Sequence, residues 1–355
     1  MATLSHVKIG NIYDLQKFKL PDGSPLLNVV NALAERDDFS KFIPAFPANQ
    51  GLTHHGLRTI TLPQGYVVDV GGSWPASKSA HEPNVEQITT IRSAYKAPSD
   101  TFTQESEAVG RQLLKTARID HVMAINQGVV NMMMVGPTTP AQSGLVGLQQ
   151  RVPWATYDNK FTWNVGGSGN DLRSCWMMKP GLDTVHFLYN KNHPTLGVEM
   201  IDKGEFPEEG LGTSADEHRW NIWIEFMIQK GIYVRDQRAV KRICNVPCGI
   251  DDLPGADLIA AIIEASIVNA PTGGTITMTE ANGTKTDLAS PWLLFCDERL
   301  YAKLVISAND KLKVYTSNKN IYQTDLPMIG TNIIILRMDA LNKVIGSGET
   351  VVAAS

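Results

Sequence analysis

Residues Leu62–Asn84 read LPQGYVVDVGGSWPASKSAHEPN and contain three glycines, three prolines and one tryptophan, Trp74, with no consistent apolar face. A segment of this kind buries too little apolar surface against itself to offset the entropy lost on ordering more than twenty residues. Three explanations fit it: a flexible lid over an active site, a loop that cradles phosphate, or an arm whose contacts come from a neighbouring subunit. The rest of the sequence decides among them.

The flanks of this stretch favour strand structure. Thr59–Leu62 leads into it and Val85–Tyr95 follows it, and both are rich in threonine and isoleucine. Each flank mixes polar and apolar residues on both faces, so neither is a strong core strand. We therefore predict a long exposed hairpin from about His54 to Thr101, with the opening stretch at its tip.

Composition limits the classes of function. The chain has 355 residues, enough for roughly two domains, and 43% apolar with 19% charged residues is typical of an ordered globular protein. A formal net charge of -4 argues against a protein whose main task is gripping nucleic-acid phosphates. Four cysteines are too few for a disulfide framework, and we find neither a secretory leader nor an eighteen-residue apolar run. We expect a soluble protein kept in a reducing cytoplasm.

Two helices are predicted around the hairpin. Ser24 followed by Pro25 is a good helix start, after which Leu26, Leu27 and Leu33 share one side. The strongest helix runs from about Thr103 to Met134 and would be about 45 Å long at 1.5 Å per residue, the length of a strut. Its predicted apolar stripe ends with Val122, Ile125, Val129 and Met133.

The second half is rich in strands and ends in a compact unit. The run RWNIWIEFMIQKGIYV alternates with period two, and we place a turn at its Lys230-Gly231 dipeptide. DLPGADLIAAIIEASI is predicted to be a helix buried over most of its circumference, because its leucines and isoleucines lie all around it. PWLLFC and GTNIIILRMDA are predicted to be buried strands, and DERLYAKLVISAND a helix with Asp297 near its start.

Recognisable chemistry is sparse. His54, His55 and His81 could be metal ligands, but adjacent histidines on a strand point to opposite faces, so we interpret all three as exposed loop histidines. Cys244 and Cys248 read better as buried thiols than as a metal or redox pair. The glycine-rich runs at 164–171 and 269–275 lack the lysine of a phosphate-binding loop and are interpreted as turns. The pairs Asp251-Asp252 and Asp297-Glu298 precede helices and are interpreted as caps.

Trp74 is the one residue for which we favour a functional role over a structural one. It lies in GGSWP, and glycines and a proline cannot build a pocket around an indole ring locally. A large exposed aromatic residue on such a segment is typical of an interaction surface.

The order of the predicted elements resembles the major capsid proteins of tailed bacteriophages, which share the α+β Hong Kong 97 fold. Short strings resemble the podovirus-like branch of that family: ATLSH (2–6), SGLVGLQQR (143–151), VRDQRAVKRI (234–243), FCDERLYAKL (295–304) and RMDALN (337–342). The resemblance implies five parts: an N-terminal arm (1–52), an E-loop (53–101), a P domain with a spine helix and long strands (102–246), an A domain (247–330), and a C-terminal strand and tail (331–355). The strand-rich block precedes the helical unit here, which suggests a permuted connectivity of the fold.

The resemblance also implies a function. The family's subunits form hexamers and pentamers of an icosahedral head around double-stranded DNA, and the E-loop reaches across a neighbouring subunit. It thereby makes Trp74, Tyr66, Lys78, His81, Leu26, Leu27 and Leu33 candidates for inter-subunit contacts. Implied partners are other copies of the chain, scaffolding and portal proteins and possible cement proteins; the packaged DNA is faced but not specifically bound, and no membrane is involved. We expect a virion protein assembled in the bacterial host cytoplasm, with no catalytic residue, metal or cofactor.

Some relatives cross-link an E-loop lysine to an asparagine of a neighbour. Lys78 lies in the corresponding loop, but no partner or catalytic acid is identifiable, so we do not predict the bond. Two alternatives stay open: an encapsulin-like compartment that encloses cargo enzymes, and a cytosolic hydrolase that uses residues 62–84 as a lid with His81 and Asp69.

Overall fold

The computed structural model describes residues 38–99, 107–136, 146–168, 172–193, 197–209, 218–248, 256–271, 275–279, 285–289, 291–311, 315–317, 326–329, 333–339, 341 and 352. These residues fall into two compact units. Unit 1 takes its described residues from Ile91–Gly128 and Val198–Ile228, and unit 2 from Glu35–Thr90, Val129–Gly197 and Gln229–Ser355. No helix within these described ranges combines the length and apolar character needed to cross a bilayer.

Unit 1 is a long helix on a sheet of long strands. Its elements are β4 (Thr89–Pro98), α4 (Glu107–Met134), β8 (Val198–Glu209) and β9 (His218–Val234), of which α4, β4 and β9 extend by a few residues into unit 2. β9 lies between β8 and β4, and β8 runs antiparallel to it.

His121 of α4 holds the helix on the sheet. Its Nδ1 lies 2.8 Å from Ser93 Oγ on β4, its ring stacks on Phe226 of β9 at 5.3 Å, and Tyr95 packs edge-on at 5.7 Å. The predicted stripe of α4 is only partly confirmed: Ile125, Val129 and Met133 are buried, whereas Val122 lies 45% exposed.

Unit 2 is built on a seven-stranded sheet in the order β14-β15-β16-β13-β6-β10-β5. Its strands are β5 (Thr162–Asn164), β6 (Leu172–Met178), β10 (Val240–Pro247), β13 (Trp292–Cys296), β14 (Tyr315–Ser317), β15 (Leu326–Ile329) and β16 (Ile333–Arg337). Every residue of β6 and β13 is buried, which explains why PWLLFC reads as a continuous apolar run. The predicted strands over PWLLFC and GTNIIILRMDA are confirmed.

Two helices, α6 (Ala256–Ile267) and α7 (Glu298–Lys311), cover one face of this sheet. Leu258 and Ile262 of α6 and Leu300 of α7 enter the same apolar cluster as Leu294 and Ile335 of the sheet. The prediction that α6 is buried around most of its circumference is wrong, because Ile263 is 38% and Ile267 70% exposed. A helix on the outside of one sheet face needs only one apolar side within its own unit.

Several short elements complete unit 2. They are α2 (Phe39–Phe42), η2 (Leu148–Gln150), α5 (Val152–Ala155), η3 (Gln237–Ala239) and the antiparallel pair β11 (Thr275–Thr279) and β12 (Lys285–Ala289). α2 places the Phe39 ring edge-on against Phe187 and Phe295, at 5.0 and 5.1 Å between ring centroids.

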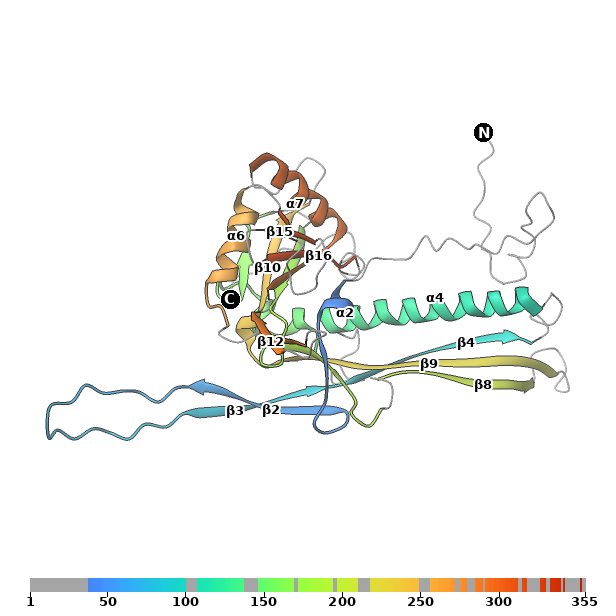
Figure 1. The fold of residues 1–355 in the computed structure, drawn as a ribbon, viewed down its shortest axis with the longest axis horizontal. Coiled ribbons are helices and arrows are strands. Elements are labelled where there is room, and N and C mark those ends of the chain that lie inside the picture. Colours follow the sequence, from blue (N-terminus) through green and yellow to red (C-terminus); the bar gives the residue numbers. More distant parts are fainter. Residues whose placement is uncertain are drawn as a thin grey trace. The chain divides into compact units, whose positions relative to one another are not determined.

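The predicted hairpin is present as β2 (Thr53–Thr61) and β3 (Ala80–Gln87), an antiparallel pair of unit 2 that projects beyond the rest of that unit (Figure 1). At its base, β1 (Ala45–Pro47) runs parallel to β7 (Val185–Tyr189), which pairs antiparallel with the last residues of β9.

Two sequence predictions in this region need correction. The returning flank Val85–Tyr95 is not one strand: it breaks at Ile88, which is buried beside Ala48, Leu188 and Tyr233, and β4 then joins β9 instead of β2. Nor is there a turn at Lys230-Gly231, since β9 continues to Val234. A Cβ atom at Gly231 would lie 2.8 Å from the Gln87 carbonyl oxygen, so the glycine permits a close backbone approach.

The seven-stranded sheet draws strands from both sides of the expected boundary between a P domain (102–246) and an A domain (247–330). β5, β6 and β10 come from before that boundary, β13 to β15 from after it, and β16 from the expected tail. The five expected parts and the permuted connectivity stay predictions.

Candidate functional site

The feature of the chain that most needs an external partner is the hairpin β2–β3 with its tip, which we call the arm (residues 53–87; tip, residues 62–79). Every residue from 59 to 83 is exposed. Exposed apolar side chains include Leu62 at 82% and Trp74 at 69%, together with Val67 and Val70. Several large apolar side chains exposed along one short segment are typical of a surface that another protein covers.

The tip is closed by a turn and a few polar contacts. Gly72 N donates to the Asp69 carbonyl oxygen at 2.9 Å, and Gly71 adopts φ +86°, a conformation that favours glycine. Ser77 Oγ donates to the Gln64 carbonyl at 3.0 Å. These contacts fix a local shape without burying the apolar side chains.

Four of the seven predicted contact residues lie on the arm. Trp74, Tyr66 and Lys78 are exposed on the tip, and His81 is exposed on β3, where its ring nitrogens lie 3.1 Å from Thr59 Oγ1 and 3.2 Å from Ser79 Oγ. Leu26, Leu27 and Leu33 lie outside the described residues. The role of all seven in inter-subunit contacts stays a prediction.

The acid–base pair of the hydrolase alternative is not assembled. Asp69 lies in the turn at the end of the tip, whereas His81 lies on β3 with Thr59 and Ser79 at its two ring nitrogens. The interpretation of the histidines as exposed loop residues is correct in exposure for His55 and His81, although both are on strands, and is wrong for His54, which is half-buried on β2.

In contrast to the tip, the root of the arm is fixed to unit 2 by an ion pair. Arg151, just before α5, grips Glu86 of β3 with Nη1–Oε1 at 2.5 Å and Nη2–Oε2 at 3.0 Å. Both side chains are largely buried, 15% and 12% exposed. Burial raises the pKa of Glu86 and the Arg151 guanidinium opposes that rise. Beside this pair, Asn84 Nδ2 donates to the Val234 carbonyl oxygen at 2.9 Å.

An aromatic cluster holds the other strand of the root. The His54 ring lies 4.4 Å from the Tyr233 ring, and His186 lies 5.3 Å from Tyr233 and 5.0 Å from Phe46. Burial lowers the pKa of His54 and lowers that of His186 to about 4, so both rings are neutral at pH 7. Gly56 passes directly over the Tyr233 hydroxyl.

Because the root is fixed to unit 2, the direction of the arm is fixed at its base. The exposed apolar tip can therefore bind a second molecule. The residue pattern of the sequence indicates the tip, but it gives no sign of the root residues Glu86, Arg151, Tyr233 and Gly56. Arg151 stands in the string SGLVGLQQR, yet its partner lies 65 positions away, so no local pattern could have paired them.

The other candidate sites of the sequence have structural roles. Cys244 and Cys248 are buried and form no disulfide, as predicted, and burial raises the pKa of Cys244 to about 11, which keeps it a thiol. Asp297 Oδ1 accepts from Leu300 N at 2.8 Å, which confirms it as a cap of α7, whereas Asp251-Asp252 lies outside the described residues. Within the described ranges, no three His, Cys, Asp or Glu side chains gather as metal ligands would.

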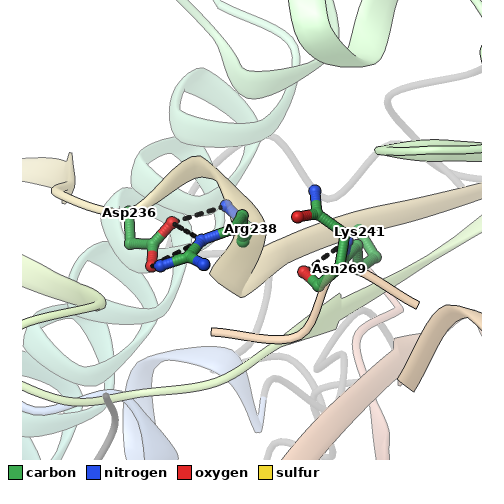
Figure 2. A network of polar contacts seen from close by, with 4 residues as sticks. All are labelled: Asp236, Arg238, Lys241 and Asn269. Atoms are coloured by element: carbon green, nitrogen blue, oxygen red, sulfur yellow. Dashed lines mark hydrogen bonds and ion pairs between the residues drawn. The ribbon is translucent and has the colours of Figure 1, made fainter. Parts of the chain in front are cut away.

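Lys241 is a buried cation that sequence analysis did not single out. Its Nζ donates to the carbonyl oxygens of Lys160 at 3.0 Å, Val268 at 3.3 Å and Asn269 at 3.2 Å, the last two just beyond the end of α6. Figure 2 shows Lys241 beside Asn269, with Asp236 held separately by Arg238. Burial lowers the pKa of Lys241 to about 8. Because three carbonyl oxygens, two of them at a helix C-terminus, accept hydrogen bonds from its ammonium group, Lys241 has a structural role.

Comparisons with known proteins agree with this architecture. Residues 21–344 match the family model described as major capsid protein GP7. Among solved structures, the chain is similar to a protein of bacteriophage epsilon15, with 15% identity, a TM-score of 0.60, and 95% of this chain and 97% of that chain covered. A bacteriophage JBD30 capsid structure matches with 8% identity, a TM-score of 0.46, and 88% and 93% covered. No curated protein matches the chain.

The epsilon15 likeness confirms the predicted α+β fold of the Hong Kong 97 type. The family match covers most of the chain and favours a phage capsid over an encapsulin-like compartment. The chain belongs to the major capsid protein GP7 family and is a structural protein of a viral shell.

Proposed function

We propose that copies of this chain form hexamers and pentamers that close into an icosahedral phage head around double-stranded DNA, with each arm docked on a neighbouring subunit. The observation that carries the proposal is the contrast within the arm. Its root is held by a largely buried ion pair and an aromatic cluster, while Trp74 and its apolar neighbours at the tip stay exposed. The next copy then covers the apolar side chains of the tip that one copy leaves exposed.

Symmetry turns this contact into a shell. The docking surface on the neighbour differs from the tip itself, so the contact is heterologous, and heterologous contacts that close generate rings. The segment with Leu26, Leu27 and Leu33 docks on a neighbouring spine helix or arm in the same manner. Many weak contacts, repeated over a closed shell, then resist the pressure of packaged DNA.

The chemistry of the chain suits a wall that faces DNA without binding it. A formal net charge of -4 gives packaged phosphates no strong general attraction. Assembly takes place in the bacterial host cytoplasm, with scaffolding, portal and possible cement proteins, and the virion is of the podovirus-like type. In this proposal residues 53–101 act as the E-loop and 102–246 and 247–330 as the P and A domains.

Sedimentation of the purified protein, with negative-stain electron microscopy of the fastest fraction, tests the proposal. We expect closed shells or rings of five and six subunits. If the protein alone stays small, the test is repeated after co-expression with the other head proteins of its phage. A discrete monomer or dimer under both conditions would contradict the proposal.

A further inference from the structure

A pocket of about 490 Å³ lies at the root of the arm, beside β2. Phe46, Leu57, Leu182 and Tyr233 form its apolar and aromatic walls, and its polar lining consists of three histidines, His54 among them, and Arg235. The volume falls within the range of about 300–1,000 Å³ that is typical of ligand pockets. All of these residues belong to unit 2.

One wall of the pocket is the His54 ring. His54 Nδ1 is buried and makes no hydrogen bond to any described residue. By contrast, His186 Nδ1 lies 3.3 Å from the Gly181 carbonyl oxygen, so that ring already has a partner. A buried unpaired nitrogen is costly, and in the tautomer that carries its proton on Nε2, Nδ1 accepts a hydrogen bond from an N–H or O–H group.

The rim of the pocket also has capacity for a carboxylate. Arg235 is half-exposed and donates through one nitrogen, Nη1, to Asp183. A guanidinium group carries five N–H donors in a planar fork, so this single bond leaves donors for a second acid. The pocket therefore fits an occupant with a large apolar ring, an N–H donor and a nearby negative charge.

The tip of the arm has these three properties. Trp74 provides a large ring with an N–H donor and is 69% exposed. Asp69 is the only acidic residue of the tip, so it is the one tip residue that can pair with an arginine. Because both lie in the same exposed turn region, one insertion can place both.

We propose that the tip of each arm docks into the root pocket of a second copy, with the Trp74 indole between the apolar walls and Asp69 at Arg235. This inference rests on the proposed function, and it specifies which surface of the neighbour receives the arm. It makes the root pocket the receptor and the tip the ligand of one head-to-tail contact.

The arm cannot fill its own pocket while its strands stay paired. β2 is nine residues long and pairs with β3 along nearly all of its length. At about 3.3 Å per residue this separates the tip from the root by roughly 30 Å. A tip that enters this pocket must therefore come from another copy, and a contact between two different surfaces is of the kind that closes rings.

Disulfide trapping between two differently labelled copies tests the inference. One copy carries Ser73→Cys, which leaves Trp74 in place, and the other carries Leu182→Cys at the pocket. The four native cysteines are buried, so they compete little for oxidation. A matched control replaces Leu182→Cys with Met200→Cys, an exposed position of unit 1. Because a disulfide requires Cα atoms within about 7 Å, we expect at least about tenfold more mixed disulfide at position 182 than at position 200.

The outcomes separate this inference from the proposed function. Shells cross-linked between positions 73 and 182 support both. If shells form without this cross-link, or with a cross-link to position 200 instead, the root pocket is not the receptor of the tip. That result would leave the proposed capsid function unaffected. If the unlabelled protein forms no shell even with the other head proteins, the proposed function fails and this inference with it.

A charge-reversal pair provides a second test that needs no cysteine. Asp69→Arg and Arg235→Asp should each lower the yield of shells about tenfold, and combining them should restore most of the yield, because the ion pair is re-formed with exchanged signs. Equal yields for all variants, or a double variant as poor as the worse single one, would overturn the contact.

Discussion

At the scale of single residues, the exposed tryptophan of the tip carries the clearest expectation. Trp74 is 69% exposed and Trp220 on β9 is 54% exposed, so the chain offers a matched pair of exposed indoles inside and outside the arm. Trp74→Ala should lower shell yield or the melting temperature of shells while the isolated subunit keeps its unfolding free energy within about 0.5 kcal/mol, because most of the residue is exposed within one copy.

Sedimentation of assembled material and denaturant unfolding of the subunit measure these two effects, with Trp220→Ala as the control that spares the tip. An isolated Trp74→Ala subunit that is unfolded would show instead that the indole belongs to the core of its own subunit.

Gly56 sets the contact between the arm and Tyr233. A Cβ atom there would lie 1.8 Å from the Tyr233 hydroxyl oxygen, whereas one at Gly65 would meet nothing within 4 Å. Gly56→Ala should therefore lower the free energy of unfolding by about 1–3 kcal/mol through overpacking. Gly65→Ala should change it by less than about 0.5 kcal/mol. Urea unfolding of both variants checks this; equal effects would show that Tyr233 moves aside without cost.

Lys241 makes stability depend on alkaline pH. Its folded-state pKa is lowered to about 8 from 10.5 by burial. Below pH 8 the folded and unfolded states both carry the proton; between pH 8 and 10.5 only the unfolded state keeps it. The free energy of unfolding contributed by Lys241 should therefore rise by about 1–3 kcal/mol across this window.

The free energy of unfolding is measured by chemical unfolding at pH 7.5 and at pH 10. Comparing the parent chain with Lys241→Met and Lys203→Met isolates the contribution of Lys241. Lys241→Met should lack the rise, and Lys203→Met, at an exposed lysine, should keep it. An unchanged pH dependence in Lys241→Met would contradict the assignment.

Residues were predictable where their role is local. The isolation of Trp74 among glycines and a proline foretold its exposure, and Asp297 before a helix foretold the cap. Gly56, Tyr233 and Glu86 were not predictable, because their roles depend on partners from distant parts of the chain.

At the scale of elements, the arm depends on the ion pair at its root. Two arginine–glutamate pairs involve this hairpin: Arg151–Glu86, largely buried, and Arg58–Glu82, at 2.8 Å with both side chains about a third to a half exposed. Removing one partner of a buried pair leaves an uncompensated charge, whereas exposed pairs contribute about 0–1 kcal/mol.

Arg151→Met should therefore lower the free energy of unfolding by about 2–4 kcal/mol and speed hydrogen exchange in β3, while Arg58→Met should cost less than about 1 kcal/mol. Urea unfolding with exchange mass spectrometry compares the two. Equal costs would show that burial at the root does not distinguish them.

Element types were largely predictable and their partners were not. The hairpin, α4, α7 and β13 follow from residue pattern. The predicted turn at Lys230-Gly231 failed because a glycine that admits a neighbouring backbone looks the same in sequence as one that turns the chain. The break at Ile88 was missed because that residue is buried by Leu188 and Tyr233, which come from other strands.

At the scale of the whole molecule, the arm is incomplete within one copy. The order of elements was enough to suggest the family, and the match over residues 21–344 establishes it. Where the tip docks depends on a second copy, so neither residue pattern nor the fold of one chain contains it. The central claim is that residues 62–79 gain their burial from a neighbour.

Hydrogen exchange of the amides in residues 62–79, in isolated subunits and in assembled shells, tests this claim most directly. We expect at least about 100-fold slower exchange in shells, equivalent to about 2.7 kcal/mol of stabilisation by the bound neighbour. The buried strand β13 should exchange equally slowly in both states and serves as the internal control. Tip amides that exchange at the same rate in shells and subunits would contradict the account.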